Sequence, residues 1–151
     1  MIAEGDEAPE LGSGAPTWAE LRGRRVVVYF FPRAGTYGCT RESKGFASRY
    51  GQLRRAGAEV IGVSVDDAAA QSSFRESCGL PFPLVSDPTG AISRRFGVLG
   101  GWGLARRVTV LVGPDGRVEK VIASPLPGRH VSAVAKVLGL DETLPPSDGD
   151  P

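Results

Sequence analysis

Cys39 is the residue of this chain whose type and surroundings are best suited to redox or nucleophilic chemistry. Six apolar residues run from Val26 to Phe31, Pro32 ends the run, and a short turn containing Gly35 leads to a helix start. The unpaired N–H groups and the dipole of a helix N-terminus favour thiolate over thiol and can bind an anionic oxygen. The sequence therefore predicts a reactive thiolate on the first turn of a helix that follows a buried strand.

The helix that begins near Cys39 has an apolar face to hold it against a core. Phe46, Tyr50 and Leu53 are spaced four and three residues apart, as a buried helical stripe requires, and Gly57 ends the segment. The charged residues of this helix are expected on its solvent side: Arg41, Glu42, Lys44, Arg49, Arg54 and Arg55.

Strand and helix patterns alternate along the rest of the chain. Strands are predicted at 60–65, 84–86, 108–112 and 117–122, and the last two flank a hairpin turn at 113–116. Helices are predicted at 68–78, between a cap at Asp66 or Asp67 and Gly79, and from Asp87 to about Arg95. The four glycines of 97–103 predict a mobile loop, and a last helix has Val131, Val134, Val137 and Leu138 on its apolar face.

This order of elements predicts an α/β fold. Strands separated by helices indicate a parallel core, and the closing hairpin adds antiparallel strands at one edge. We expect a thioredoxin-like fold with a central mixed sheet and helices on both faces. Residues 1–140 are predicted to form a single domain, and 141–151, acidic and rich in proline, a flexible tail.

Composition excludes several classes of function. The chain has 151 residues, 41% of them hydrophobic, and no apolar run near the ~18 residues of a membrane span. A net charge of +1 without a Lys/Arg run argues against capture of nucleic acid or of an anionic membrane. The N-terminus lacks a signal-peptide pattern, which predicts a cytoplasmic protein. The single histidine, His130, cannot form a metal cluster with the cysteines and is expected to cap or decorate the last helix, so neither metal nor cofactor is predicted.

The segment 31–40, Phe-Pro-Arg-Ala-Gly-Thr-Tyr-Gly-Cys-Thr, resembles the peroxidatic loop of the peroxiredoxins, in particular the bacterioferritin-comigratory or Q-type branch. Thr36 and Cys39 occupy its Thr-x-x-Cys positions, whereas Tyr37 stands where the family normally has a proline that shapes the loop. Residues 5–11, Gly-Asp-Glu-Ala-Pro-Glu-Leu, resemble the N-terminal motif of the family. The resemblance extends from Gly5 to about Leu138 and independently implies the thioredoxin-like fold.

The resemblance implies roles for individual residues. Cys39 would attack the O–O bond of a peroxide held near Pro32, while the N–H groups of Gly38 and Cys39 donate to oxygen and the Thr36 hydroxyl bridges sulfur and substrate. The segment that begins at Arg107 matches the family's arginine segment, so its guanidinium is expected beside the sulfur; Arg106, on the opposite face of the predicted strand, is the rival. Trp102 either lines the substrate entrance or anchors its loop.

A second cysteine is expected to resolve the oxidised form. Many Q-type relatives have a resolving cysteine five residues after the first, where this chain has Lys44; other members have theirs in the region of Cys78, the remaining candidate. A disulfide needs Cα atoms within about 7 Å, so two helical cysteines are expected to unwind locally before the bond forms. The alternative is that Cys78 simply packs in its helix.

The sequence favours a thiol peroxidase that reduces hydrogen peroxide and organic hydroperoxides and is recycled by thioredoxin or a similar dithiol. Alternatives are a one-cysteine peroxidase resolved by an external thiol, a thiol-disulfide oxidoreductase or redox sensor, and a non-catalytic thioredoxin-fold binding module. The oxidoreductase is weakened because the chain has no Cys-x-x-Cys. Members of the Q-type branch are often monomeric, and no apolar edge demands otherwise, so a monomer is expected.

Overall fold

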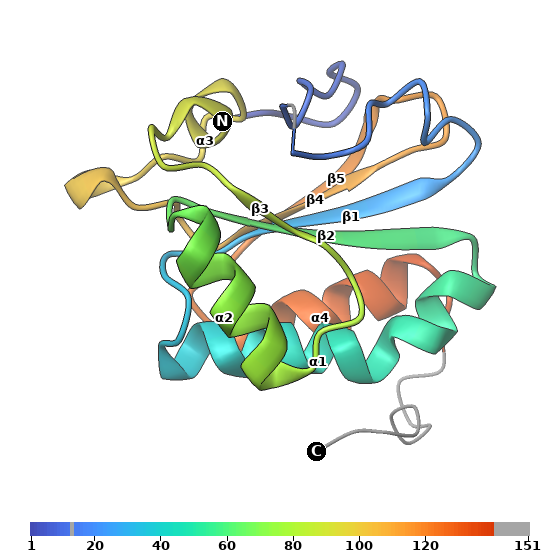
Figure 1. Cartoon of the computed structure of the whole chain (residues 1–151). Coiled ribbons are helices and arrows are strands. Elements are labelled where there is room, and N and C mark those ends of the chain that lie inside the picture. Colours follow the sequence, from blue (N-terminus) through green and yellow to red (C-terminus); the bar gives the residue numbers. More distant parts are fainter. Residues whose placement is uncertain (13, 141–151) are drawn as a thin grey trace.

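A five-stranded mixed sheet forms the centre of the computed structural model, which describes residues 1–12 and 14–140 (Figure 1). The strands, in sheet order, are β3 (Leu84–Ser86), β2 (Ala58–Ser64), β1 (Arg25–Phe30), β4 (Val108–Val112) and β5 (Val118–Ala123). β1 pairs in parallel with β2, which pairs in parallel with β3, whereas β4 is antiparallel to both β1 and β5. The predicted parallel core with a closing antiparallel hairpin is confirmed.

The helices are α1 (Tyr37–Arg55), α2 (Ala68–Cys78), α3 (Ala91–Arg95) and α4 (Pro127–Val137), with a 3₁₀ turn at Gly101–Gly103. α2 has its predicted bounds: the Asp67 carboxylate accepts from the Ala70 amide at 2.8 Å, and Gly79 ends the helix in the left-handed conformation. None of the helices in residues 1–12 and 14–140 is long and apolar enough to cross a bilayer.

The sheet separates two layers of core. α1, α2 and α4 cover one face, while α3 and the N-terminal segment lie over the other (Figure 1). Along β1, Val27 and Tyr29 join the cluster under the three long helices, whereas Val26, Val28 and Phe30 join the opposite cluster. This alternation follows from the two-residue period of a strand. The same period applies to the neighbouring strand β4, whose side chains point alternately to the two faces of the sheet.

Two details of the predicted helices are wrong. α3 begins at Ala91 rather than at Asp87, because residues 88–90 form a turn and the Asp87 carboxylate caps the helix from a distance, accepting from the amides of Ile92 and Ser93 at 3.0 and 2.8 Å. On α4, Val137 is 45% exposed and does not face the core, whereas the predicted Val134 is buried and Val131 and Leu138 pack against the core; His130 and Ala135 complete the buried face.

The glycine-rich segment 97–103 has local order of its own. The Gly100 amide donates to the Leu104 carbonyl at 2.8 Å, and Leu99 forms a β-bridge with Ala105. Trp102 has a φ of 64° in the 3₁₀ turn. The predicted tail at 141–151 lies outside the described residues.

Candidate active site

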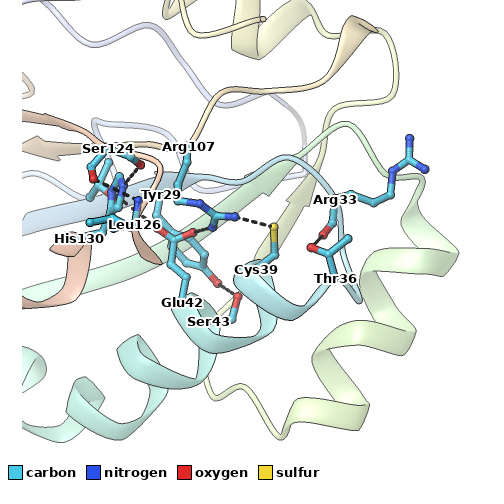
Figure 2. Close-up of polar contacts among 11 residues, drawn as sticks. Tyr29, Arg33, Thr36, Cys39, Glu42, Ser43, Arg107, Ser124, Leu126 and His130 are labelled. Atoms are coloured by element: carbon cyan, nitrogen blue, oxygen red, sulfur yellow. Dashed lines mark hydrogen bonds and ion pairs between the residues drawn. The ribbon is translucent and has the colours of Figure 1, made fainter. Parts of the chain in front are cut away.

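Cys39 is the third residue of α1, and its side chain is fully buried. The buried strand β1 leads through the loop 31–36 to this helix, whose first-turn N–H groups have no intrahelical acceptors, as the sequence predicts. Thr36 is the N-cap by backbone geometry, but its hydroxyl donates to the Arg33 carbonyl at 2.9 Å (Figure 2). The role of that hydroxyl as a bridge between sulfur and substrate stays a prediction.

Arg107 lies beside the sulfur. Its Nη2 donates to Cys39 Sγ at 3.4 Å (Figure 2). Because side chains alternate along an extended strand, Arg107 shares with Thr109 the face that α1 covers, whereas the exposed Arg106 packs its stem near Gly100. The structure thus places Arg107, not Arg106, at Cys39.

Glu42 fixes the other end of the guanidinium. Arg107 Nη1 donates to Glu42 Oε1 at 2.7 Å, and Glu42 is 0% exposed. The expectation of a solvated Glu42 is wrong because Glu42 lies three residues after Cys39, on the same helical face, where Arg107 provides a charged partner. Burial raises the pKa of Glu42 to about 7, although the charge and hydrogen bond of Arg107 oppose the rise.

His130 lies behind Glu42 and is also fully buried. Its Nδ1 is 2.8 Å from Thr109 Oγ1 and 3.6 Å from Glu42 Oε2, and its Nε2 is 2.8 Å from the Ser124 carbonyl oxygen. The expectation that His130 caps or decorates α4 is therefore wrong: it joins α4 to the sheet. Burial lowers the pKa of His130, which favours the neutral imidazole.

Gly38 provides clearance for Arg107. A Cβ at this position would lie 3.0 Å from Arg107 Nη2 and 3.5 Å from Pro127 Cγ. A glycine before Cys39 therefore lets the guanidinium approach the sulfur over the backbone of α1. Pro32, which follows β1, is half-buried at the start of the same loop.

Asp66 anchors this loop from the connection between β2 and α2. Its Oδ2 accepts from the Ala34 amide at 2.7 Å and from the Ser64 hydroxyl at 2.6 Å. Ser64 in turn accepts from Gln71 of α2 at 2.9 Å. The loop before Cys39 is thereby tied to the helix that ends at Cys78.

The other predicted residues lie apart from this cluster. Trp102 is 99% exposed, so in the structure its ring neither lines a wall of the site nor anchors its loop. Tyr37 is 78% exposed and stacks under Arg41. Cys78 is half-buried at the end of α2, both cysteines are free, and Cys78 packs against the same hydrophobic cluster that contains Cys39.

The arrangement is suited to nucleophilic attack by sulfur. A buried thiol lies at a helix N-terminus, with a fixed guanidinium in contact and backbone amides nearby to receive an oxygen anion. In the part of the chain that the structure describes, no group of three His, Cys, Asp or Glu side chains is placed to bind a metal ion.

Comparison with known proteins agrees with this chemistry. The profile of the AhpC/TSA family matches residues 7–121. This chain is a peroxiredoxin of the AhpC/TSA family. Chloroplastic peroxiredoxin Q of Oryza sativa subsp. japonica is 34% identical to this peroxiredoxin over 146 residues, which cover 91% of this chain and 67% of the rice protein.

Solved structures of Q-type peroxiredoxins have the same fold. Peroxiredoxin Q of Xanthomonas campestris is 32% identical, with a TM-score of 0.77 over 82% of this chain and 83% of that one. Peroxidoxin BcpB of Mycobacterium tuberculosis is 29% identical, with a TM-score of 0.80 over 92% of this chain and 97% of that one. The α/β thioredoxin-like fold expected from the sequence is confirmed, and so is the assignment of this peroxiredoxin as a peroxidase.

Glu42 and His130 are the site residues that sequence reasoning missed. Glu42 is at the third position after Cys39 and the fourth before Phe46, so helical spacing puts it on the buried face with them. His130 precedes the buried Val134 by four residues, which is the same signal on α4.

Proposed function

We propose that this peroxiredoxin reduces hydrogen peroxide and small organic hydroperoxides with Cys39 as the nucleophile. The observation that supports the proposal most directly is the 3.4 Å contact between Cys39 Sγ and Arg107 Nη2, with Arg107 held by Glu42. The bacterioferritin comigratory protein of Xanthomonas campestris, 31% identical to this chain, is associated with alkyl peroxide reduction activity, which favours the same substrate class here.

The first step is displacement at the O–O bond. The Cys39 thiolate attacks one peroxide oxygen, an S–O bond forms, the O–O bond breaks, and the other oxygen leaves as hydroxide or alkoxide and takes up a proton. Sulfur is oxidised to a sulfenic acid while the peroxide is reduced by two electrons. In this proposal Arg107 and the N–H groups of Gly38 and Cys39 stabilise negative charge on the oxygens, and Pro32, in the loop before Cys39, contacts the peroxide.

Cys78 is the proposed resolving residue. Its thiolate attacks the sulfur of the sulfenic acid, the S–S bond forms as the S–O bond breaks, and hydroxide leaves and takes up a proton from solvent to give water; a dithiol such as thioredoxin then reduces the disulfide by exchange. Both cysteines are free and helical in the structure, so we expect the first turn of α1 to unwind around Cys39, and the last turn of α2 to follow where the geometry of the bond requires it. The shared hydrophobic cluster and the Asp66 connection place the two segments within one part of the fold.

We propose that the protein acts as a monomer, since Cys39, Arg107 and Glu42 contact one another within a single chain. A reducing compartment such as the cytoplasm would supply the dithiol that the cycle consumes. Gel filtration of the reduced and oxidised protein tests the first point, since a dimer in either state would contradict it.

The decisive experiment is the intact mass of the reduced protein after one equivalent of hydrogen peroxide, measured beside Cys39→Ser and Cys78→Ser. Loss of two hydrogens without dimerisation, abolished in both variants, is expected. A sulfenic or sulfinic adduct on Cys39 in the wild type would indicate a one-cysteine enzyme resolved by an external thiol. No rapid change would contradict the peroxidase proposal and favour exchange with protein disulfides or a binding module.

A further inference from the structure

One buried oxygen behind the active site has no hydrogen-bond partner. Glu42 Oε1 receives Arg107 Nη1 at 2.7 Å, but Oε2 has none within the described part of the chain. Both Glu42 and its neighbour His130 are 0% exposed, so water from bulk solvent does not screen them. A carboxylate oxygen left in this state is costly, which raises the question of what neutralises it.

The hydrogen bonds of His130 identify the group that Oε2 faces. The Ser124 carbonyl can only accept, so Nε2, 2.8 Å away, must carry a hydrogen. In the neutral ring Nδ1 then has a lone pair, which accepts from the Thr109 hydroxyl at 2.8 Å. Glu42 Oε2 lies 3.6 Å from this same nitrogen. Two lone pairs facing each other at 3.6 Å in a dry site repel, whereas a proton on either atom replaces that repulsion with an electrostatic attraction.

We propose that Glu42 and His130 share one proton behind Arg107, and that His130 is thereby a positioning residue for the reaction at Cys39. The proton lies on Glu42 Oε2 and faces Nδ1, or lies on Nδ1 and faces Oε2, with Thr109 turning its hydroxyl accordingly. The proton comes from solvent and no bond other than O–H or N–H changes. The inference rests on Cys39 being the peroxide-reactive thiol of the proposed function.

The shared proton sets the charge next to the sulfur. An ionised Glu42 beside a neutral His130 would cancel the charge of Arg107, whereas the protonated pair leaves one net positive charge 3.4 Å from Cys39 Sγ. The other titratable groups around the pair are Cys39 on α1 and Tyr29 on β1, and burial raises the pKa of Tyr29 so that it stays neutral. The elevated pKa of Glu42 agrees with a proton held in this place.

The first test counts the proton without any peroxide. His130 is the only histidine of the chain, so selective ¹⁵N-histidine labelling of the reduced wild type gives the tautomer of one ring. Infrared difference spectra against Glu42→Gln show whether the carboxyl is protonated. Besides the hydrogen on Nε2, we expect one further proton on the pair at pH 6 to 7. It gives either a protonated carboxyl beside the Nε2–H tautomer or a carboxylate beside an imidazolium. A carboxylate beside a neutral ring would overturn the proposal.

The second test uses the rate constant for reaction with hydrogen peroxide. Glu42→Gln resembles the protonated form, with an oxygen for Arg107 and an N–H on the side of Nδ1, so it is expected to lose rate by only about threefold, whereas Glu42→Ala loses more than tenfold. An equal loss in both would mean that Arg107 needs an ionised partner and would overturn the proposal. His130→Leu is expected to lower the rate about tenfold, and to add little in the Glu42→Ala background, because His130 acts through Glu42. Additive losses would indicate a purely structural histidine. A wild type that does not react with peroxide would contradict the proposed function and leave the proton count intact as the test of the pair.

Discussion

Replacement of Gly38 by alanine should slow the enzyme by displacing Arg107 from Cys39. The new Cβ would stand 3.0 Å from Arg107 Nη2, closer than ordinary contact distance, and Pro127 Cγ at 3.5 Å closes the other side. Arg107 cannot simply rotate away, because Nη1 is bound to Glu42 at 2.7 Å. Nη2 must therefore move away from Gly38, and its contact with Cys39 lengthens.

The size of the effect follows from that displacement. Moving Nη2 by about half an ångström takes its distance to Sγ from 3.4 Å to roughly 3.9 Å. At an effective dielectric constant of about 20, the attraction between guanidinium and thiolate falls from about 4.9 to about 4.3 kcal/mol. The loss of about 0.6 kcal/mol corresponds to a roughly threefold lower rate constant, and complete rupture of the contact would cost about 1.5 to 3 kcal/mol. In contrast, alanine in place of glycine in a helix adds up to about 1 kcal/mol of stability.

Gly128→Ala is the matched control. Gly128 is the second residue of α4, as Gly38 is of α1, and a Cβ there meets nothing within 4 Å. Stopped-flow measurement of sulfenic acid formation gives the rate constant, and urea denaturation gives the free energy of unfolding. Gly128→Ala is expected to gain stability and keep its rate, whereas Gly38→Ala is expected to lose rate. A folded Gly38→Ala protein with the wild-type rate, or an equal loss in Gly128→Ala, would refute the clearance argument.

Three further changes test the surroundings of Cys39. Arg107→Lys should lower the peroxide rate constant more than tenfold, because an ammonium cannot contact Sγ and Glu42 with two parallel N–H groups; an unchanged rate in stopped flow would remove Arg107 from the site. The pKa of about 7 for Glu42 in the folded protein lies above its usual 4.5, so ionisation of Glu42 destabilises the fold. Compared with Glu42→Gln, the unfolding free energy of the wild type should therefore fall by up to about 3 kcal/mol as the pH rises from 4.5 to 7, and stay constant above pH 7. A difference between the two proteins that does not change with pH in urea denaturation would contradict this. Asp66→Ala removes the acceptor of the Ala34 amide, so it should lower the unfolding free energy by about 1 to 3 kcal/mol and also lower the rate constant for peroxide. Asp67→Ala removes only the cap of α2 and should lower the unfolding free energy alone. Equal losses of rate in both variants would argue against the role of Asp66 as an anchor of the loop.

Local rules were sufficient for the elements and for part of the site. The apolar run of β1, the cap at Asp67 and the left-handed Gly79 are short-range signals, and the structure has them where the sequence predicts. The choice of Arg107 over Arg106 rested on the resemblance of its segment to that of the peroxiredoxins, since the two-residue period of a strand only separates the two arginines onto opposite faces. α3 was predicted too early because Asp87 was read as an adjacent N-cap, although its carboxylate reaches amides five and six residues ahead.

Long-range pairing explains what the sequence did not predict. Glu42 was assigned to solvent because a charge usually marks an exposed face, but its partner is 65 residues away in the sequence. His130 was assigned to the helix surface for the same reason, although Thr109 and the Ser124 carbonyl satisfy both ring nitrogens in the folded chain. Neither partner can be identified from helical periodicity, which shows only that both residues face inward.

The two-layer core also limits how much of the protein would unfold when the helix ends at the cysteines unwind. Cys39 and Cys78 both border the cluster under α1, α2 and α4, while the cluster on the far side of the sheet includes Val28 and Phe30 but neither cysteine. The unwinding proposed for disulfide formation would therefore expose apolar surface on one side of the sheet only, as a subglobal opening rather than a global one. Backbone amides of β1, which pairs on both edges, are expected to exchange only as slowly as the whole domain unfolds, and those at the ends of α1 and α2 to exchange independently. The core on the far side of the sheet would thus keep the same packing in the reduced and the oxidised protein.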